Sequence, residues 1–277
     1  MEVKIYTPHI ALQEFVLNIL TINAQLPQSM ENVVTPYPPS PFQSLIFYCN
    51  HPVSVGQASR KIFQLQPLTV LTGPQYSRVN VKVHKQIKSV RVDFLPGALH
   101  RLLGVPMDEL FDMGFDAVDL LGVTMRQLND QLQEISDLDE AKILIEKFLL
   151  HRIHTYTTKA LLPFDPAMQV LLKAAGDMSI KQVASLACLS IKQFERKCKE
   201  RIGMNPKTFT RILKFSKAYR LHEQQPTLSW TNIAYKAGYY DQMHVIKGFK
   251  VFAGVNPSVI ERQLLSTPLR MQKHMRY

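Results

Sequence analysis

The sequence predicts an α+β protein of two domains, a β-rich N-terminal domain followed by an all-helical C-terminal domain. Short runs rich in β-branched and aromatic residues fill the first part of the 277-residue chain, and such runs are typical of antiparallel strands. From Pro166 onward the apolar residues recur at helical spacing instead. The charge changes at the same place: residues 1–166 carry 14 Lys and Arg against 16 Asp and Glu, a net −2, whereas residues 167–277 carry 19 against 6, a net +13.

The composition limits the classes of protein to which the chain can belong. A hydrophobic fraction of 46% and a charged fraction of 20% are typical of a globular protein. No apolar run reaches the roughly 18 residues of a membrane span, and the N-terminus lacks the pattern of a secretory signal. The three scattered cysteines, Cys49, Cys188 and Cys198, favour reduced thiols in a cytosol over a disulfide frame or a zinc site. The basic second part predicts a polyanion partner, and on charge alone a membrane surface also fits.

The predicted β domain spans residues 1–123. Pro, Gly, Asn and His punctuate its apolar runs, as expected for an antiparallel sheet or barrel. A stiff proline-rich loop is expected at Tyr37–Pro41 and a short helix that ends at Gly104. Strands are expected within 42–50, 61–75, 77–84 and 87–94.

Residues 124–156 are predicted to form a pair of helices. Thr124–Gln127 and Asp137–Glu140 each have the spacing of a helix start. The pair either completes the core of the β domain or forms a dimer interface, and both readings are open from sequence. A linker with two prolines is expected at 157–165. The two apolar stripes are Leu128, Leu132 and Ile135, and then Leu138, Ala141, Leu144, Ile145 and Phe148.

The C-terminal domain is predicted at 166–265 and is followed by a basic tail at 266–277. No strand pattern is visible in this domain. The helices are expected at 166–175, 179–187, 191–202, 206–223, 229–237, 241–252 and 257–264.

A Gly-x-Asn-Pro segment occurs twice, at residues 203–206 and 254–257, with the glycines 51 residues apart. In both copies a pair of short helices precedes it. Val183, Ala184 and Ala187 in the first pair correspond to Ile233, Ala234 and Ala237 in the second, at an offset of 50; Phe194, Cys198 and Ile202 correspond to Val245, Phe249 and Ala253, at an offset of 51. Such pairs, with a small residue at the crossing, predict a duplicated helix-turn-helix.

Local signals define the ends of these helices. Ser179, Ser190 and Asp241 are expected as N-caps. The two glycines are expected to end helices in a left-handed conformation, and Pro206 and Pro257 to occupy the first position of the next helix. One continuous helix at 206–223, about 27 Å long for roughly 18 residues, would hold the two units apart by nearly one DNA turn of about 34 Å.

These residues resemble a known family. The segments "SIKQVASLACLS", "IGMNPKTFTRILKFSKA" and "LSWTNIAYKAGYYDQMHVIKGFKVFAGVNPSVI" are similar to the AraC/XylS-type DNA-binding domain, in which a long helix joins two helix-turn-helix units. In the first domain, "RVDFLPGALHRLLGVPMDEL" resembles the Phe-x-Pro-Gly segment found in sensor domains of some such regulators. That second resemblance implies a cupin-like β fold and a sensor role for residues 1–123. Together the resemblances imply a bacterial transcription factor.

The first recognition helix is expected to read bases through Lys192, Glu195 and Arg196, which also match the contacting positions of the family. Arg196 would donate to guanine and Glu195 would accept from cytosine. A helix salt bridge from Glu195 to Lys199 is an equally good alternative. Gln193 and Lys199 are expected at phosphates.

The second recognition helix is expected to read bases through Met243, His244 and Lys247. An exposed methionine is more natural against a base than on a bare surface, although packing against Tyr239 and Tyr240 is an alternative. Lys207, Arg211 and Lys214 of the long helix are phosphate candidates, and each taken singly is an ordinary solvated side chain. Gln242 and Lys250 complete the phosphate set.

Enzyme chemistry finds little support in the sequence. His151 and His154 share a helix face without a third metal ligand, and His84 and His100 are expected at the surface or as caps. Nucleotide-binding and serine-hydrolase motifs are absent. Cys49 lies in a strand-like run and is expected to be buried. We therefore expect no catalytic residue, no metal and no cofactor.

The sequence as a whole predicts a cytoplasmic, sequence-specific regulator of transcription that binds double-stranded DNA and is nucleoid-associated when bound. A small-molecule effector or a protein partner would act on the N-terminal domain; neither its identity nor its site is predicted. RNA polymerase and a second copy of the chain are further candidate partners, and a membrane is not expected. The alternative is an architectural DNA-binding protein without an effector.

Overall fold

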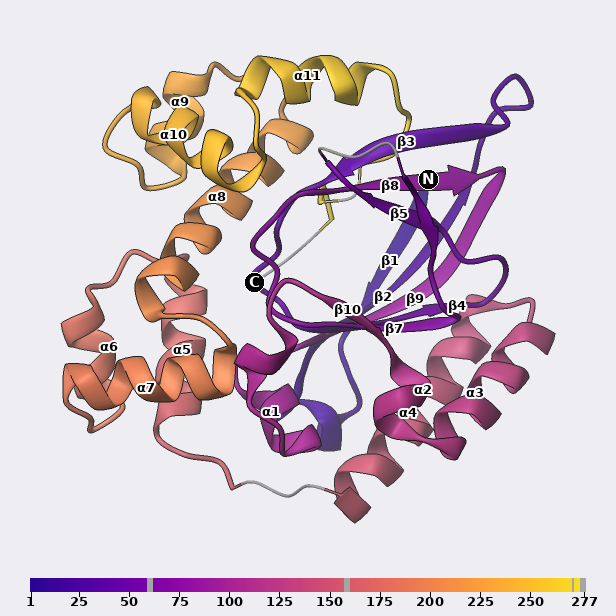
Figure 1. Cartoon of the computed structure of the whole chain (residues 1–277), viewed down its shortest axis with the longest axis horizontal. Coiled ribbons are helices and arrows are strands. Elements are labelled where there is room, and N and C mark those ends of the chain that lie inside the picture. Colours follow the sequence, from indigo (N-terminus) through magenta and orange to yellow (C-terminus); the bar gives the residue numbers. More distant parts are fainter. Residues whose placement is uncertain (59–61, 157–159, 271, 275–277) are drawn as a thin grey trace.

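Figure 1 shows the computed structural model of the chain, which describes residues 1–58, 62–156, 160–270 and 272–274. The N-terminal domain contains two antiparallel sheets that face each other, and the C-terminal domain is helical, so the α+β class with a β-rich first domain is confirmed. The two facing sheets are consistent with the expected cupin-like fold. The first sheet has the order β1 (Glu2–Tyr6), β2 (Val16–Gln25), β9 (Gln86–Phe94), β4 (Ser44–Tyr48), β7 (Thr69–Thr72) and β10 (Gly114–Asp116). The second has the order β3 (Asn32–Tyr37), β8 (Val79–His84), β5 (Ser54–Gln57) and β6 (Gln64–Leu65).

The central strand β9 shows how the first sheet divides the domain into two layers. Successive side chains of a strand point to opposite faces. Val90, Val92 and Phe94 belong to the large core that the helices cover. Ser89 and Arg91 point instead into the space between the two sheets. Both faces of β9 are therefore buried, one against helices and one against the second sheet.

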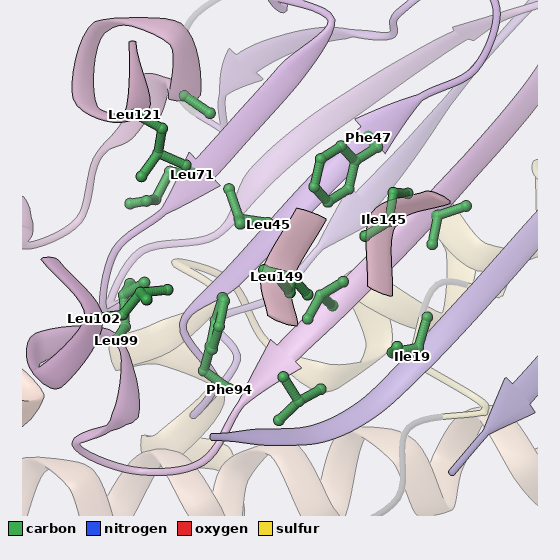
Figure 2. Packing of buried hydrophobic residues seen from close by; sticks show 14 of the residues in the cluster. Ile19, Leu45, Phe47, Leu71, Phe94, Leu99, Leu102, Leu121, Ile145 and Leu149 are labelled. Carbon is green, nitrogen blue, oxygen red and sulfur yellow. The ribbon is translucent and has the colours of Figure 1, made fainter. Parts of the chain in front are cut away.

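Helices α1 (Ala98–Leu103), α2 (Ala117–Leu121), α3 (Val123–Glu134) and α4 (Leu138–Tyr156) cover the outer face of the first sheet. Figure 2 shows Ile145 and Leu149 of α4 lying over Leu45 and Phe47 of β4. Both predicted apolar stripes contribute to this core: Leu128, Leu132, Ala141 and Ile145 are buried, and Ile135, Leu138, Leu144 and Phe148 pack against them. The alternative in which the pair completes the core of the β domain accounts for these residues.

Two expected local features differ in the structure. Thr124 does not cap α3: the cap is Gly122, because α2 ends there and the chain turns directly into α3. The Thr124 hydroxyl donates to the carbonyl of Leu121 at 3.3 Å instead. His100 is not at the surface: it is 2% exposed, and its Nδ1 lies 2.8 Å from the carbonyl oxygen of Val105, beyond the end of α1 at Gly104.

The C-terminal domain contains all seven expected helices. The bounds differ from the expected ones by at most two residues at each end. Residues 157–159 of the expected linker lie outside the described residues, and residues 164–165 belong to the first of these helices. The helices are α5 (Phe164–Lys173), α6 (Ile180–Leu186), α7 (Ile191–Ile202), α8 (Pro206–Gln224), α9 (Trp230–Lys236), α10 (Gln242–Phe252) and α11 (Pro257–Leu265).

Candidate nucleic-acid interface

Helices α6 and α7 form the first helix-turn-helix. Ser179 and Ser190 each cap a helix and form a capping box with the glutamine three residues later, which satisfies backbone N–H groups that a helix start leaves free. Between the helices, the backbone N–H of Leu189 donates to the carbonyl of Ala184 at 3.0 Å. Phe194, Cys198 and Ile202 of α7 are buried against α5 and α6, so the opposite face of α7 is free to point outward.

Helices α9 and α10 form the second helix-turn-helix in the same way. Ser229 caps α9, and the Asp241 carboxylate caps α10 by accepting the His244 N–H at 2.9 Å. Hydrogen bonds from His244 hold the pKa of Asp241 below its usual value, so this carboxyl group is ionised at neutral pH. Val245 and Phe249 are fully buried. The duplicated motif predicted from the sequence is therefore present, with matching buried positions.

The repeated Gly-x-Asn-Pro segments end one helix and start the next, as predicted. Gly203 and Gly254 have φ values of 88° and 70°, a region that L-residues rarely adopt. Pro206 and Pro257 occupy the first turn of α8 and α11. Gly203 has a further role, because a Cβ there would lie 2.6 Å from the carbonyl oxygen of Met107. The first recognition helix thus ends in close contact with the β domain.

The 19-residue helix α8 joins the two units and, at 1.5 Å per residue, is about 28 Å long. Its apolar side is buried along its length, including Phe209, Ile212 and Leu213 near its start. Near its end Phe215 and Tyr219 pack against Phe249 of α10. The helix is therefore a shared core element of both units rather than a free connector.

Lys214 of α8 links the two units directly. Its ammonium pairs with Asp177, just before α6, and donates to the carbonyl of Gly238 in the turn of the second unit; both distances are 2.9 Å. This side chain was expected at a phosphate. In the structure it fixes the relative position of the two helix-turn-helix units, and a phosphate contact would compete with these bonds.

The remaining expected DNA-contacting residues lie on the surface. In α7, all five candidates are exposed. Lys199 pairs with Asp108 of the β domain at 3.5 Å instead of with Glu195, so the alternative helix salt bridge is not the arrangement seen. The exposed α7 side chains are Lys192, Gln193, Glu195, Arg196 and Lys199.

In α10 the predicted DNA-contacting residues are exposed as well. Met243 is 57% exposed, which argues against the alternative that it packs into the turn tyrosines. His244 Nδ1 lies 2.9 Å from the Asp241 carboxylate. Since an ionised carboxylate only accepts hydrogen bonds, Nδ1 carries the proton in this contact, and Nε2 is the ring nitrogen left to face outward. The exposed α10 side chains are Gln242, Met243, His244, Lys247 and Lys250; Lys207 and Arg211 of α8 are exposed as well.

Sequence reasoning missed the contacts that attach α7 to the rest of the molecule. Arg201 makes two hydrogen bonds to the Asp165 carboxylate of α5, at 2.9 and 2.8 Å, with both side chains at most 3% exposed. Glu200 lies 3.7 Å from His100, and the Gln43 amide donates to the carbonyl of Ile202 at 3.2 Å. The only available signal was one arginine within a run of charged residues, and nothing local distinguishes it from its neighbours.

The β domain contains a cavity of about 150 Å³ between its two sheets. Its wall is mostly apolar, with contributions from both sheets, such as Leu20, Ile46 and Val81. Arg91 forms a polar part of the wall: its guanidinium is buried, and it bonds to Asp93 at 2.6 Å, to Ser44 at 3.0 Å and to the Tyr37 hydroxyl. These acceptors keep the pKa of Arg91 above its usual value despite burial.

One polar group on the cavity wall makes no hydrogen bond within the described residues. The Ser89 hydroxyl is buried and lacks a hydrogen-bond partner among the described residues, and Ser89 lines the cavity. A buried hydroxyl without a partner costs roughly 1–3 kcal/mol. A ligand that hydrogen-bonds to it would recover part of that cost. Cys49 lies in the core, as expected, and burial raises its pKa to about 11, which makes it a poor nucleophile.

Two further features of the described residues bear on other functions. None of the helices in that part of the chain is long and apolar enough to cross a membrane. Within the same ranges, no three His, Cys, Asp or Glu side chains gather in an arrangement suited to a metal ion. His151 and His154, which share a face of α4, are both exposed.

Comparison with family models supports the assignment of the C-terminal domain. A model described as "Helix-turn-helix domain" matches residues 183–263, from α6 to α11. This confirms the resemblance of this domain to the AraC type. A model described as "Domain of unknown function (DUF6597)" matches residues 4–116, which contain all ten strands except the first two residues of β1. None of the curated proteins compared with the chain matches it.

Among solved structures, the chain is similar to ToxT from Vibrio cholerae, with 11% identity, coverage of 91% of this chain and 99% of that chain, and a TM-score of 0.48. It is also similar to a regulator with an AraC-type DNA-binding domain from Chromobacterium violaceum (21% identity, 39% and 95% covered, TM-score 0.34). A DNA-binding transcriptional dual regulator from Escherichia coli K-12 matches at 17% identity (39% and 99% covered, TM-score 0.33).

Proposed function

We propose that the protein is a sequence-specific DNA-binding regulator of transcription, controlled by a ligand or partner at its β domain. The observation that carries the proposal is the pair α7 and α10. Each is the second helix of a helix-turn-helix, and each exposes polar residues on its first turns. Such helices enter the major groove of DNA and contact base edges. The match of residues 183–263 to a helix-turn-helix family supports the same conclusion.

Helix α8 sets the geometry of binding. Its length of about 28 Å is close to the 34 Å of one DNA turn. Since both units share the core along α8, their recognition helices keep a fixed separation. We infer that α7 and α10 enter successive major grooves on one face of the duplex.

In the first groove, Arg196 donates two hydrogen bonds to a guanine, and Glu195 accepts from the amino group of a cytosine. Lys192 at the start of α7 contacts a base or the adjacent phosphate. Each good bidentate pair contributes about 1–3 kcal/mol of discrimination against a wrong base. The absence of a Glu195–Lys199 pair in the structure leaves Glu195 available for this role.

In the second groove, Met243 packs against a thymine methyl group, and Lys247 donates to a base or phosphate. With Nδ1 bound to Asp241, Nε2 of the His244 ring faces a base edge. Phosphates would be bound by Gln193, Lys199, Lys207, Arg211, Gln242 and Lys250. Lys214 would join them only by giving up its bonds to Asp177 and Gly238.

The cavity of the β domain is the proposed effector site. A mostly apolar wall with a few polar groups is typical of small-molecule sites. A volume of about 150 Å³ accepts a molecule the size of benzene. The domain that surrounds the cavity also carries Asp108 and His100, which contact α7, so a change in the cavity can reach the first recognition helix.

Several further aspects belong to this proposal. The regulator acts in a bacterial cytoplasm, where it associates with the nucleoid, and RNA polymerase is a candidate partner. A homodimer through the exposed side of α3 and α4, for example around Ile143, is a candidate assembly. The proposed functional regions are the β domain up to residue 123, the helical pair up to 156, the linker up to 165, the helical domain after it, and the tail from 266. Catalysis is not part of the proposal, since a helix-turn-helix domain binds DNA.

Genome-wide mapping of bound DNA tests the proposal. A regulator gives discrete sites that share a motif, and the genes beside them indicate the effector. Binding spread evenly over the chromosome, with affinity that depends on salt but not on sequence, would instead support an architectural DNA-binding protein.

A further inference from the structure

The chain continues beyond α11 as a C-terminal tail, defined here as the described residues 266–270 and 272–274, which turns back onto the β domain (Figure 1). Leu269 is 2% exposed and belongs to a cluster with Tyr37, Val81 and Val83 from the second sheet. The tail forms a compact turn there: the Leu269 N–H donates to the Thr267 hydroxyl at 3.1 Å. The described part of the predicted basic tail therefore makes an apolar contact with the second sheet of the β domain.

The tail also forms part of the wall of the cavity between the sheets. Arg270 and His274 line that cavity together with residues of both sheets. Arg270 is held by the tail itself, because its Nη1 donates to the carbonyls of Thr267 and Leu269 at 2.7 and 3.0 Å. The described residues thus place part of the DNA-binding half of the chain in the wall of the proposed effector site.

The same tail is bonded to the end of α8. The Glu223 carboxylate accepts the backbone N–H of Gln272 at 2.8 Å, and the Gln224 amide donates to the carbonyl of Lys273 at 2.7 Å. Helix α8 is the element that sets the separation of the two recognition helices. The tail therefore connects the cavity to the helix that determines the DNA-binding geometry.

The contact between the tail and the end of α8 buries several polar atoms that are not satisfied by hydrogen bonds. Both polar atoms of the Gln272 side chain are buried and lack a hydrogen-bond partner among the described residues, as do Glu223 Oε1 and the Tyr219 hydroxyl. Each such atom carries a desolvation cost that water would remove. The apolar burial of Leu269 holds the tail in place against this cost, so an apolar competitor for its position can release it.

We propose that the tail is an intramolecular plug of the cavity: Leu269 occupies space that a larger apolar ligand takes, and such a ligand expels the tail and frees the end of α8. A benzene-sized molecule fits the space of about 150 Å³ that remains with the plug in place. A ligand of two fused or linked rings requires more, and we expect it to displace Leu269, which belongs to one cluster with the cavity-lining residues Tyr37 and Val81. The inference rests on the proposed effector role of the cavity, and it names the regulation of that site.

Two full-length variants test the plug. Leu269→Asp places a charge at a buried position and expels the tail, whereas Leu265→Asp makes the same change at a leucine that is 82% exposed at the end of α11. The uncharged fluorophore N-phenyl-1-naphthylamine serves as the two-ring apolar probe. Its affinity is measured by fluorescence titration without DNA, after circular dichroism at the same temperature has verified that each variant is folded.

Leu269→Asp is expected to bind the probe at least fivefold more tightly than the unaltered chain, and Leu265→Asp within twofold of it. Equal affinity in all three chains, or weaker binding in Leu269→Asp, would overturn the plug, since the tail would then be inert or part of the ligand contact. Should Leu269→Asp not fold, Leu269→Ala replaces it with the same expected direction.

Trypsin supplies an independent readout on the unaltered chain. Cleavage after Arg270 or Lys273, followed by mass spectrometry, reports release of the tail. Saturating probe is expected to raise the cleavage rate at least fivefold, and an unchanged or lower rate contradicts expulsion. Neither experiment contains DNA, so a failure of the plug is distinguishable from a failure of DNA recognition, which the mapping of bound sites tests separately.

Discussion

The two helix-turn-helix units have matching internal designs but different attachments to the rest of the molecule. The first is anchored through α7 by the buried Arg201–Asp165 pair and by contacts to Gln43 and His100. The second is anchored through aromatic packing of Trp230 and Phe249 against the end of α8. An ionic anchor is sensitive to the loss of a single partner, whereas an aromatic cluster shares its contacts among several rings. The β domain is therefore expected to control the first unit through specific side chains, and the second through α8 and the tail.

The largest expected effect is on the first anchor. Arg201→Ala leaves the buried Asp165 carboxylate without its charged partner and with the Leu162 N–H as a remaining donor, and we expect the free energy of unfolding to fall by about 3–5 kcal/mol. Urea denaturation followed by circular dichroism measures it. Arg262→Ala, at an exposed arginine of α11, is the matched control and should change stability by less than about 0.5 kcal/mol. Similar losses in both variants would contradict the role of Arg201 as an anchor, since an exposed arginine would then contribute as much.

The next effect separates base contacts from phosphate contacts. Arg196→Ala is expected to cost about 1–3 kcal/mol in binding to the preferred site and to relax specificity in one half-site. Lys207→Ala, at an exposed position of α8, should weaken binding equally for all sequences and reduce the salt slope by about 1. Fluorescence anisotropy with matched and mismatched duplexes at several salt concentrations measures both. Identical behaviour of the two variants would contradict the assignment of roles.

A smaller loss of stability is expected from removing helix caps in the two units. Ser190→Ala removes the capping box of α7 and is expected to cost about 1 kcal/mol of stability. Ser229→Ala removes a cap on α9 that accepts one hydrogen bond without a reciprocal partner, and it should cost less. Thermal and urea unfolding of the two variants side by side give the comparison, and the reverse order of stabilities would count against it.

The smallest effect concerns pH and the contact between α8 and the tail. Burial raises the pKa of Glu223 to about 7. Since the neutral form is favoured in the folded protein, its contribution to stability is fully present below about pH 4.5, the ordinary value, and is lost as the pH rises through 7. Glu223→Gln removes this loss and should raise the melting temperature by a few degrees at pH 8 but little at pH 5. Glu134→Gln, at an exposed site, should change neither; a pH-independent effect of Glu223→Gln would contradict the assignment.

Whether a feature could be predicted from the sequence depends on how far apart in the chain its interacting residues lie. Helix ends were predictable because Ser190, Gly203 and Pro206 act on backbone groups within a few residues. The strand β2 was missed because it is buried on both faces in places and lacks strict alternation. Arg201, His100 and Leu269 were not recognisable, since their partners lie in other elements and only the folded chain brings them together. The expected DNA-contacting residues were predictable as exposed positions because the buried stripe of each helix defines the opposite face.

The most direct test of the account is selection of bound sequences from randomised DNA by the unaltered chain and by Arg196→Ala and Lys247→Ala. We predict a motif with two half-sites about one helical turn apart for the unaltered chain. Arg196→Ala should lose sequence information in one half-site, and Lys247→Ala in the other. A motif confined to one half-site, or weaker binding in both variants without any change of motif, would contradict the claim that α7 and α10 read successive grooves.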